Sequence, residues 1–329
     1  MSNSITLTQL HEWRRISSTR AVRDIAVTWL MITLILTCLL LPEIKLAYWW
    51  LWLAASPILG ALQNRLTTLL HDAMHRTLHP KKSTSDFIGR WFCGYPVGNF
   101  FFINMIMHKH HHQQFAGQKD PNVLAYTVNK ETFLKADLIR SFFLINLLSA
   151  LLNFNQKLAN KFRFSEKDSA IEDSERFLKA EAARKDYLRL ILLHTSLLAL
   201  CVAAGVWYLY IYWVLVRVTW CSAFNSIRLF TEHHSDISDA APILSNNLKP
   251  GFIGWLERFF IAPLNFNLHG THHVAPFVPY YLLPALTDYV EKSDAQYFII
   301  RRGYLSYLFS SRSYAQDEQN LSSVENIST

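Results

Sequence analysis

Long uncharged apolar stretches constrain the fold of this chain more than any other feature. Residues 25–42 and 46–64 contain no charged side chain, and each is long enough to cross the hydrocarbon core of a bilayer. Residues 190–204 and 206–224 are two further apolar stretches, separated by Gly205. The sequence therefore predicts an all-α integral membrane protein with about four transmembrane helices in two hairpins.

Charged residues are sparse and unevenly placed. Asp, Glu, Lys and Arg make up 17% of the 329 residues, below the roughly 25% of soluble domains, and the net charge is +7. Four arginines precede the first crossing, whereas Lys45 is the one basic residue in the connection to the second, so the positive-inside rule predicts a cytoplasmic N-terminus. The sequence has no stripe of Lys and Arg with interleaved polar residues, so we expect the lipid bilayer as a partner and no nucleic acid.

The segments between the apolar stretches differ in character. Residues 87–107 contain Arg90, glycines and a proline. Irregular backbone at membrane depth is tolerated only where it is buried in protein or faces water, which favours an interfacial or re-entrant segment here. We expect 133–154 to form an amphipathic surface helix and 155–189 to form a charged, helical cytosolic insert. The predicted organisation is a cytosolic N-terminal segment at 1–24, a membrane domain at 25–310 and a disordered tail at 311–329.

Histidines gather in four short motifs. The motifs are HDAMH at 71–75, HKHHH at 108–112, EHH at 232–234 and HGTHH at 269–273. Spacings of three and four residues place side chains on one helical face. The motifs follow the second crossing, the re-entrant segment and the fourth crossing, so all are predicted at the cytosolic face around one site. The candidate metal ligands are His71, His75, His108, His111, His112, His233, His269, His272 and His273.

The number and kind of these ligands indicate the chemistry. Imidazole binds iron, zinc, copper and nickel, and a single zinc ion needs only three or four ligands, so this many convergent histidines indicate two metal ions. A site without cysteine resists thiol oxidation while O2 is activated, and a pair of irons can remove hydrogen from an unactivated carbon. Among the other histidines, we expect His11 to be solvated, His194 to be hydrogen-bonded inside the bundle and His110 to point away from the metals.

At these motifs the chain resembles the membrane fatty-acid desaturase superfamily, which includes acyl and sphingolipid desaturases, carotenoid ketolases and alkane hydroxylases. HDAMH, HKHHH and HGTHH resemble its three histidine boxes, and RLFTEHH resembles the element that contributes one more ligand between boxes two and three. The dipeptide Asp120-Pro121 matches the acidic-proline segment of the family, and HHVAPFVPYYLLP matches the proline-containing tail after box three. The resemblance covers roughly residues 65–290.

The resemblance implies a cofactor, a co-substrate and supporting residues. It implies two iron ions (Fe2+) held by the candidate histidines, with O2 as co-substrate. It also implies that Asp72 and Glu232 orient ligating imidazoles, and Arg228 lies one helical turn before Glu232, where the two can pair. Asn265 takes the position at which some relatives hold a metal-bound water, although an asparagine in a turn after Pro263 is equally a capping residue. The sequence carries no haem motif of the cytochrome b5 type, so we expect an external electron donor, either a ferredoxin or a cytochrome b5-type protein.

Three functions are compatible with this pattern. The first is an O2-dependent desaturase that introduces a double bond into a fatty acyl or lipid chain, which the proline-containing tail favours. The second is a hydroxylase or ketolase on the same scaffold, acting on a lipid or a small metabolite, because the short first box HxxxH is shared by all these enzymes. The third is a histidine-lined metal transporter, but transporter ligands lie near the bilayer midplane within crossings, and the motifs here lie outside them. The predicted location is a multi-pass membrane protein with its active site on the cytoplasmic face.

Overall fold

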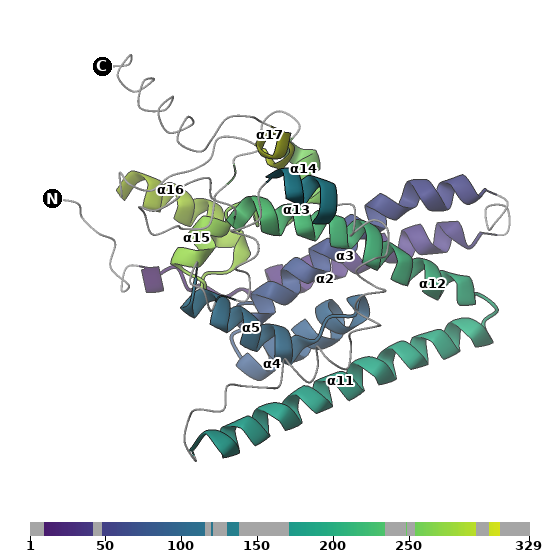
Figure 1. Ribbon diagram of the computed structural model, residues 1–329, viewed down its shortest axis with the longest axis horizontal. Helices are drawn as coiled ribbons and strands as arrows, with labels where there is room; N and C mark the ends of the chain where they lie inside the picture. The colour runs from purple at the N-terminus through teal and green to yellow at the C-terminus, as the bar shows by residue number, and fades with distance from the viewer. Residues whose placement is uncertain are drawn as a thin grey trace.

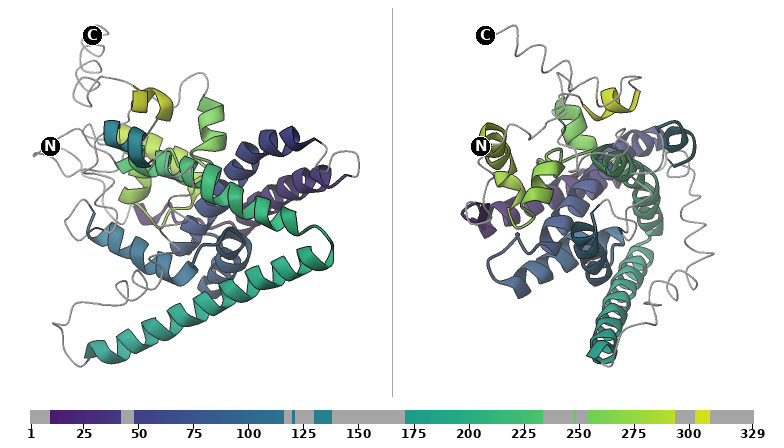
Figure 2. Two further views of the ribbon diagram at one scale, coloured as in Figure 1. Left: turned by 45° about the vertical axis from the view of Figure 1, so that its right-hand side comes forward. Right: turned by 60° about the vertical axis from the view of Figure 1, so that its left-hand side comes forward.

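The structure of the chain is a computed structural model. It describes residues 10–41, 48–115, 120, 130–137, 171–233, 248, 254–293 and 303–309. Within these ranges every regular element is helical, and no strand occurs, so the prediction of an all-α fold is confirmed. Long helices lie side by side, and two helical hairpins turn at the same end of the molecule (Figures 1 and 2).

The first hairpin consists of α2 (Ser18–Leu39) and α3 (Trp49–Met74). α2 begins a few residues before the first predicted crossing, whose apolar sequence it contains. α3 continues through Pro57, which has no N–H to donate to the carbonyl of Leu53. The hydroxyl of Ser56 donates to that oxygen instead, at 2.7 Å, so the helix passes the proline with its backbone polar groups satisfied.

The second hairpin joins α11 (Ile171–Ala203) to a helical run made of α12 (Trp207–Val216), the π-helical turn η4 (Arg217–Cys221) and α13 (Ser222–His233). Gly205 closes the turn with φ 69°, a left-handed conformation that glycine adopts without steric cost. α11 continues without a break across the predicted boundary between the charged insert and the third crossing. The remainder of that insert, 155–170, lies outside the described residues.

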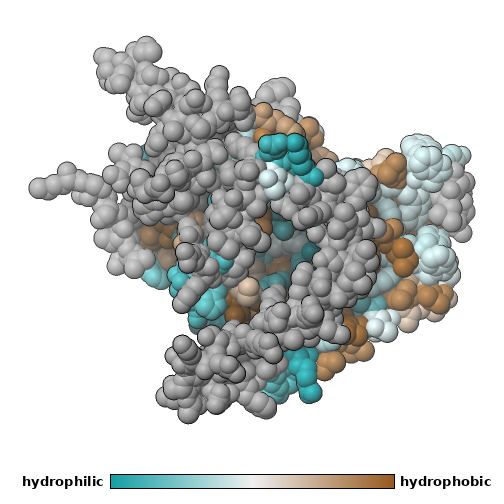
Figure 3. All heavy atoms as spheres, in the orientation of Figure 1, coloured by the Kyte–Doolittle hydropathy of each residue, from teal (hydrophilic) through white to brown (hydrophobic). Residues whose placement is uncertain are grey.

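Among the described helices, two are long and apolar enough to cross a membrane, Ser18–Leu39 and Glu181–Ala203. Only 6% of the apolar window in the second is buried inside the chain, so its side chains need another apolar environment. α3 and α12 also expose large apolar side chains, including Trp50, Leu53 and Trp207. Apolar residues gather at the right-hand end of the molecule in Figure 3, where the hairpins turn. The count of four crossings stays a prediction.

The segment between the two hairpins is a chain of short helices. It comprises α4 (Lys82–Ile88), the π-helical turn η1 (Gly89–Gly94), the 3-10 turn η2 (Tyr95–Val97) and α5 (Phe101–Gln113). No single helix covers 87–107, in agreement with the predicted interfacial or re-entrant segment.

Polar residues of the second hairpin satisfy the irregular backbone of this segment. Arg217 Nε donates to the carbonyl of Val97 at 2.8 Å, and its NH2 group donates to Asn99 Oδ1 at 3.2 Å. His194 Nε2 lies 2.8 Å from the carbonyl oxygen of Tyr95, so the prediction of a hydrogen-bonded His194 is confirmed. A broken helix can therefore be buried here because side chains replace the missing backbone bonds.

Short helices complete the described chain. α7 (Lys130–Thr132) and the π-helical turn η3 (Phe133–Asp137) cover the start of the predicted surface helix 133–154. The remainder of that helix, the predicted tail 311–329 and residues 1–9 lie outside the described residues. The C-terminal elements are α14 (Gly254–Phe260), α15 (His269–Val274), the 3-10 turn η5 (Tyr280–Leu282), α16 (Leu283–Ser293) and α17 (Tyr304–Phe309).

α3 is the central helix, and its burial fixes the site. It packs against α2, α5, α13, α14, η1 and η4. Its core stripe is fully buried and has helical spacing: Leu59, Leu62, Leu66 and Leu69. Gly89 of η1 lies against Ala73, where a side chain would clash, and this close approach lets the end of α3 meet the segment that leads into α5.

Polar contacts then tie α3 to the C-terminal elements. Asn64 Nδ2 donates to the carbonyl of Ile261 at 2.8 Å. Asp72 Oδ2 accepts from the backbone N–H of Tyr280 at 3.1 Å and from Thr77 Oγ1 at 2.8 Å. These buried contacts hold the first histidine motif beside the last, although about 200 residues separate them in sequence.

Candidate metal centre

The candidate ligands come from the ends of four elements. His71 and His75 lie at the end of α3, His108 to His112 in the last turns of α5, His233 ends α13, and α15 carries the third box. The carbonyl ends of three helices therefore point at one region, where their partial negative charge favours a cation. This region is at the end of the molecule opposite the hairpin turns (Figures 1 and 2).

All nine predicted ligands lie in two compact groups. In each group the ligand atoms lie within 4.8 Å of one another. The first group comprises His71, His75, His108, His112 and His272. The second group comprises His111, His233, His269 and His273. His11, His79, His110 and His194 belong to neither group, and His234 lies outside the described residues.

The imidazoles of the first group direct their Nε2 atoms at one another. His108 Nε2 lies 2.7 Å from His75 Nε2 and 3.0 Å from His112 Nε2. His272 Nε2 lies 3.3 Å from His112 Nε2. A neutral imidazole has one N–H and one lone pair, so these clustered nitrogens cannot all form hydrogen bonds with one another.

The second group repeats this geometry. His111 Nε2 lies 3.2 Å from the Nε2 atoms of His233 and His273. His269 Nε2 lies 3.1 Å from His273 Nε2. Imidazole nitrogens bound to one ion at about 2.1 Å, as on zinc, lie roughly 3 Å apart where the bonds meet at right angles. The spacing in both groups therefore fits nitrogens that share a metal ion.

Burial keeps these imidazoles neutral. Desolvation by burial lowers the pKa of every one of them, to about 3 for His112 and for His233. Neutral imidazoles have the lone pair that a metal needs. Both ring nitrogens of His71, and Nδ1 of His269, are buried without a hydrogen-bond partner. Buried imidazole nitrogens that have no hydrogen-bond partner and lie close to the lone pairs of other imidazoles are consistent with a metal-binding site.

Two contacts orient rings of the second group from behind. His111 Nδ1 lies 2.9 Å from Oδ1 of the buried Asp120. His233 Nδ1 lies 2.9 Å from the carbonyl oxygen of Leu229, which can only accept, so Nδ1 carries the proton and Nε2 keeps its lone pair. The sequence marked Asp120 only as part of an acidic-proline match, and its contact with His111 was not predicted.

Glu232 Oε2 lies near His269 and Arg228 without a hydrogen bond to either, so the expected orienting role of Glu232 stays a prediction. Tyr304 Oη donates to Glu232 Oε1 at 2.9 Å, and Oε2 lies 3.8 Å from His269 Nδ1 and 3.9 Å from a terminal nitrogen of Arg228. Burial raises the pKa of Glu232 to about 8. The Arg228 guanidinium also lies 4.2 Å from the ring centre of Phe266, a cation–π contact that fixes its position.

Asp72 and Asn265 both hydrogen-bond to the backbone of Tyr280. Asp72 Oδ1 is 3.9 Å from His71 Nδ1, too far for a hydrogen bond, because the Asp72 carboxyl is engaged by Thr77 and the backbone of Tyr280. Burial raises its pKa to about 7. Asn265 has φ 60° and donates from Nδ2 to the carbonyl of Tyr280 at 3.2 Å. A metal-bound water at Asn265 stays a prediction.

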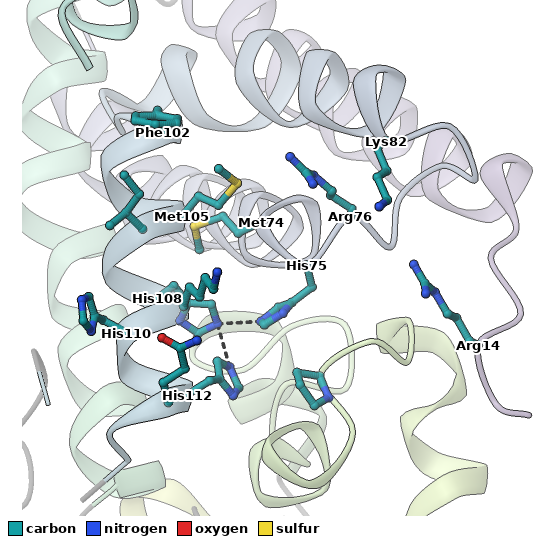
Figure 4. A pocket seen from close by; sticks show the side chains of 14 residues that line it. Arg14, Met74, His75, Arg76, Lys82, Phe102, Met105, His108, His110 and His112 are labelled. Carbon is teal, nitrogen blue, oxygen red and sulfur yellow. Dashed lines mark hydrogen bonds between the residues drawn. The ribbon is translucent and has the colours of Figure 1, made fainter. Parts of the chain in front are cut away.

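Two cavities give access to the histidines. One, of about 730 Å3, has His75, His108 and His112 in its wall (Figure 4). The other, of about 400 Å3, lies between α3, α5 and α13 and touches imidazoles of both groups, among them His71 and His233. Small molecules therefore have space on two sides of the candidate centre.

Comparison with known proteins agrees with this geometry. A family model described as fatty acid desaturase matches residues 47–304, which is more than half of the chain and includes every histidine of the two groups. The chain belongs to the fatty acid desaturase family. A desaturase-family relative, the dihydrorhizobitoxine desaturase of Bradyrhizobium elkanii, is 28% identical over 246 residues. The match covers 71% of this chain and 66% of the relative, just under two thirds of its length.

The contact between Asp120 and His111 leads to a first prediction. Replacing Asp120 by Ala removes the carboxylate that contacts His111 Nδ1, and loss of such an outer contact weakens metal affinity by about 10- to 100-fold. Metal content after dialysis against a graded series of chelator concentrations, measured by mass spectrometry, should show this loss. Glu131→Gln, which removes an exposed carboxylate paired with Lys135, is the matched control and should retain wild-type metal content. Equal retention in both variants would contradict the role of Asp120.

Acid should destabilise the metal-free protein. The pKa of the buried imidazoles is lower in the folded chain than the 6.5 of an exposed histidine, so the unfolded chain binds more protons between about pH 3 and 6.5. Stability should therefore fall as pH decreases through this range, by at most about 1.4 kcal/mol per pH unit for each imidazole. Thermal unfolding in chelator at several pH values measures this slope.

Two variants test the origin of that slope. His112→Gln should make the dependence on pH shallower, because one buried imidazole is removed. His79→Gln, outside both groups, should keep the wild-type slope. An unfolding midpoint that stays constant or rises between pH 6.5 and 4.5 would rule the explanation out.

Proposed function

We propose that this protein is a membrane di-iron desaturase that uses O2 to introduce a double bond into a fatty acyl or lipid chain. The observation that carries the proposal is that two imidazole groups adjoin. The rings of His112, in the first group, and His273, in the second, stack with centroids 4.3 Å apart. His111 and His112 are also neighbours in sequence but belong to different groups. Two ions held there would be close enough to act on one substrate.

The ligating imidazoles and the groups that contact them would have different roles. The five imidazoles of the first group would hold one iron and the four of the second group the other. Iron bound there would supply the oxidising power to remove hydrogen from an unactivated C–H bond. Asp120 and the Leu229 carbonyl keep Nε2 of two ligands free of protons and aimed inward. Burial of five of the nine ligands would limit the contact of bulk water with the metals.

The reaction requires reductant as well as O2. Loss of two hydrogens from the chain supplies two electrons, and reduction of O2 to two waters takes four. The other two electrons would come from an external donor, a ferredoxin or a cytochrome b5-type protein. A position on the cytoplasmic face of a multi-pass membrane domain would give such a donor access to the histidine end.

Desaturation is favoured over the alternatives by separate observations. Family membership and a relative whose name is that of a desaturase support loss of hydrogen over gain of oxygen. The relative is named for dihydrorhizobitoxine, so the substrate class of this chain is not limited to lipids by its relatives. Against a metal transporter, the histidines lie at helix ends, away from the middle of the apolar helices.

Product analysis tests the proposal. Cells expressing the wild type under aerobic, iron-replete conditions should accumulate a product lacking two hydrogens, detected by mass spectrometry of lipids and soluble metabolites. His108→Ala removes the nitrogen that contacts both His75 and His112, and it should reduce product at least 100-fold while the protein remains in the membrane fraction. His79→Gln should retain activity, since His79 contacts neither group. A product that gains one oxygen would assign a hydroxylase, and full activity of His108→Ala would exclude the site.

A further inference from the structure

One carboxylate on α11 is buried, although that helix lies along an edge of the molecule (Figure 1). Only 6% of the apolar window of α11 is buried inside the chain. Among the charged side chains that the structure describes on this helix, Asp186 alone is buried, with 1% of its surface exposed. A buried carboxylate needs donors from the elements that it packs against.

Both donors to Asp186 come from the segment that leads into α5. The hydroxyl of Tyr95, in η2, donates to Oδ1, and the backbone N–H of Phe102 donates to Oδ2 at 2.9 Å. Phe102 is the second residue of α5, so its N–H is one of those that a helix leaves without an internal partner. The N-cap residue, Phe100, has an apolar side chain and cannot cap the helix itself. Asp186 therefore caps α5 from a different helix.

The charge and the surroundings of Asp186 suit this capping role. The first turn of α5 contains no acidic residue, and the partial positive charge at a helix N-terminus favours an anion. Tyr187, the next residue of α11, stacks on Phe100 with ring centroids 5.9 Å apart. This aromatic contact holds α11 against the start of α5.

The turn that precedes α5 is held by the same hairpin. Three consecutive carbonyl oxygens, those of residues 95–97, accept hydrogen bonds at 2.8 Å from His194, Trp213 and Arg217, respectively. With the bond from Phe102 to Asp186, four backbone groups at the start of α5 are bound to side chains of the second hairpin. The position of this end of α5 is therefore set by α11, α12 and η4.

The opposite end of α5 carries ligands of both metal groups. His108 and His112 belong to the first group and His111 belongs to the second. Successive residues of a helix lie about 100° apart around its axis, so the rotation of α5 decides which group each imidazole meets. A rotation or shift at the start of this 13-residue helix would therefore move ligands of both ions.

From these contacts we infer that Asp186 is a positioning residue, which caps α5 from the second hairpin and thereby sets the separation of the two metal ions. This inference rests on the proposed function for the presence of two irons. It adds a residue of a membrane helix that acts at the end of α5 opposite the ligands. Asp186 acts through the N–H of Phe102, and its bond with Tyr95 keeps the carboxylate in place.

Four variants separate capping from the attachment of α11. Asp186→Ala and Asp186→Leu remove both acceptors, and the Leu variant avoids the cavity that Ala would leave. Tyr95→Phe removes one hydrogen bond of Asp186 and leaves the cap on Phe102 in place. Asp186→Asn is the conservative replacement, because Oδ1 can accept from Phe102 while Nδ2 donates to the hydroxyl oxygen of Tyr95.

Amide hydrogen exchange of the metal-free protein in nanodiscs measures the cap without turnover. Exchange over 101–107 should be about fivefold faster in Asp186→Ala and Asp186→Leu, which is the loss of one helix cap expressed as an opening equilibrium. Asp186→Asn and Tyr95→Phe should exchange at the wild-type rate in this range. Residues 59–70 of α3 should be unchanged in all four variants, whereas a general loss of structure would raise exchange in both ranges.

X-ray absorption of the anaerobic, iron-loaded protein measures the separation of the ions. Asp186→Leu should give an altered or broadened iron–iron distance, whereas the wild type, Asp186→Asn and Tyr95→Phe should share one distance. Glu181→Gln removes a partly exposed carboxylate of α11 that pairs with Lys185, and this charge control should match the wild type.

Three outcomes would overturn the inference. The first is wild-type exchange and wild-type iron–iron distance in Asp186→Leu. The second is an equal change in Tyr95→Phe and Asp186→Leu, which would assign Asp186 to the attachment of α11. The third is faster exchange over 101–107 with an unchanged iron–iron distance, because the cap would then have no effect on the metals.

Product analysis keeps this inference distinct from the proposed function. A double bond formed by the wild type, with no effect of Asp186→Leu on exchange or on the iron–iron distance, would overturn the positioning role and leave the desaturase standing. An altered distance in Asp186→Leu, with no double bond formed by the wild type, would support the positioning role and overturn the desaturase.

Discussion

The structure depends on buried imidazoles that face one another. In each group, imidazole nitrogens lie about 3 Å from one another, and their N–H groups and lone pairs cannot all be paired. Neither ring nitrogen of His71 has a hydrogen-bond partner. A buried polar group without a partner costs about 1–3 kcal/mol. A cation between the nitrogens removes this cost, so the rest of the fold can be understood as the scaffold that holds lone pairs in place for metal ions.

Several polar contacts between separate segments of the chain hold the histidine motifs in place. Asp72 joins the end of α3 to the backbone of Tyr280, and Tyr304 supports Glu232 behind His269. Arg217 satisfies the broken segment that leads into α5. Each contact joins segments far apart in sequence, and each lies close to a histidine motif. Precision at the metal centre therefore comes from buried hydrogen bonds, whereas α3 contributes several of the fully buried apolar side chains of the core.

The sequence predicted those features that depend on local pattern. Apolar length predicted helices and hairpins, and the spacing within HDAMH, HKHHH and HGTHH selected the histidines that the structure brings together. It predicted a helical insert in the charged region but not that this helix continues without a break into the third crossing, because the change in charge was taken as a boundary. Pairs one turn apart, such as Glu181 and Lys185 at 2.6 Å, support a helix there. Tyr304 contacts Glu232 across 72 residues, and a single sequence carries no local signal for such a contact. Asp120 lies only nine residues after His111, but the sequence marked it only as part of a motif match and did not indicate its partner.

The most direct measurement of the central claim is anomalous diffraction at the iron edge from crystals of anaerobically iron-loaded protein. The account predicts two anomalous peaks, one among His71, His75, His108, His112 and His272 and the other among His111, His233, His269 and His273. A single peak, or peaks away from these imidazoles, would contradict it.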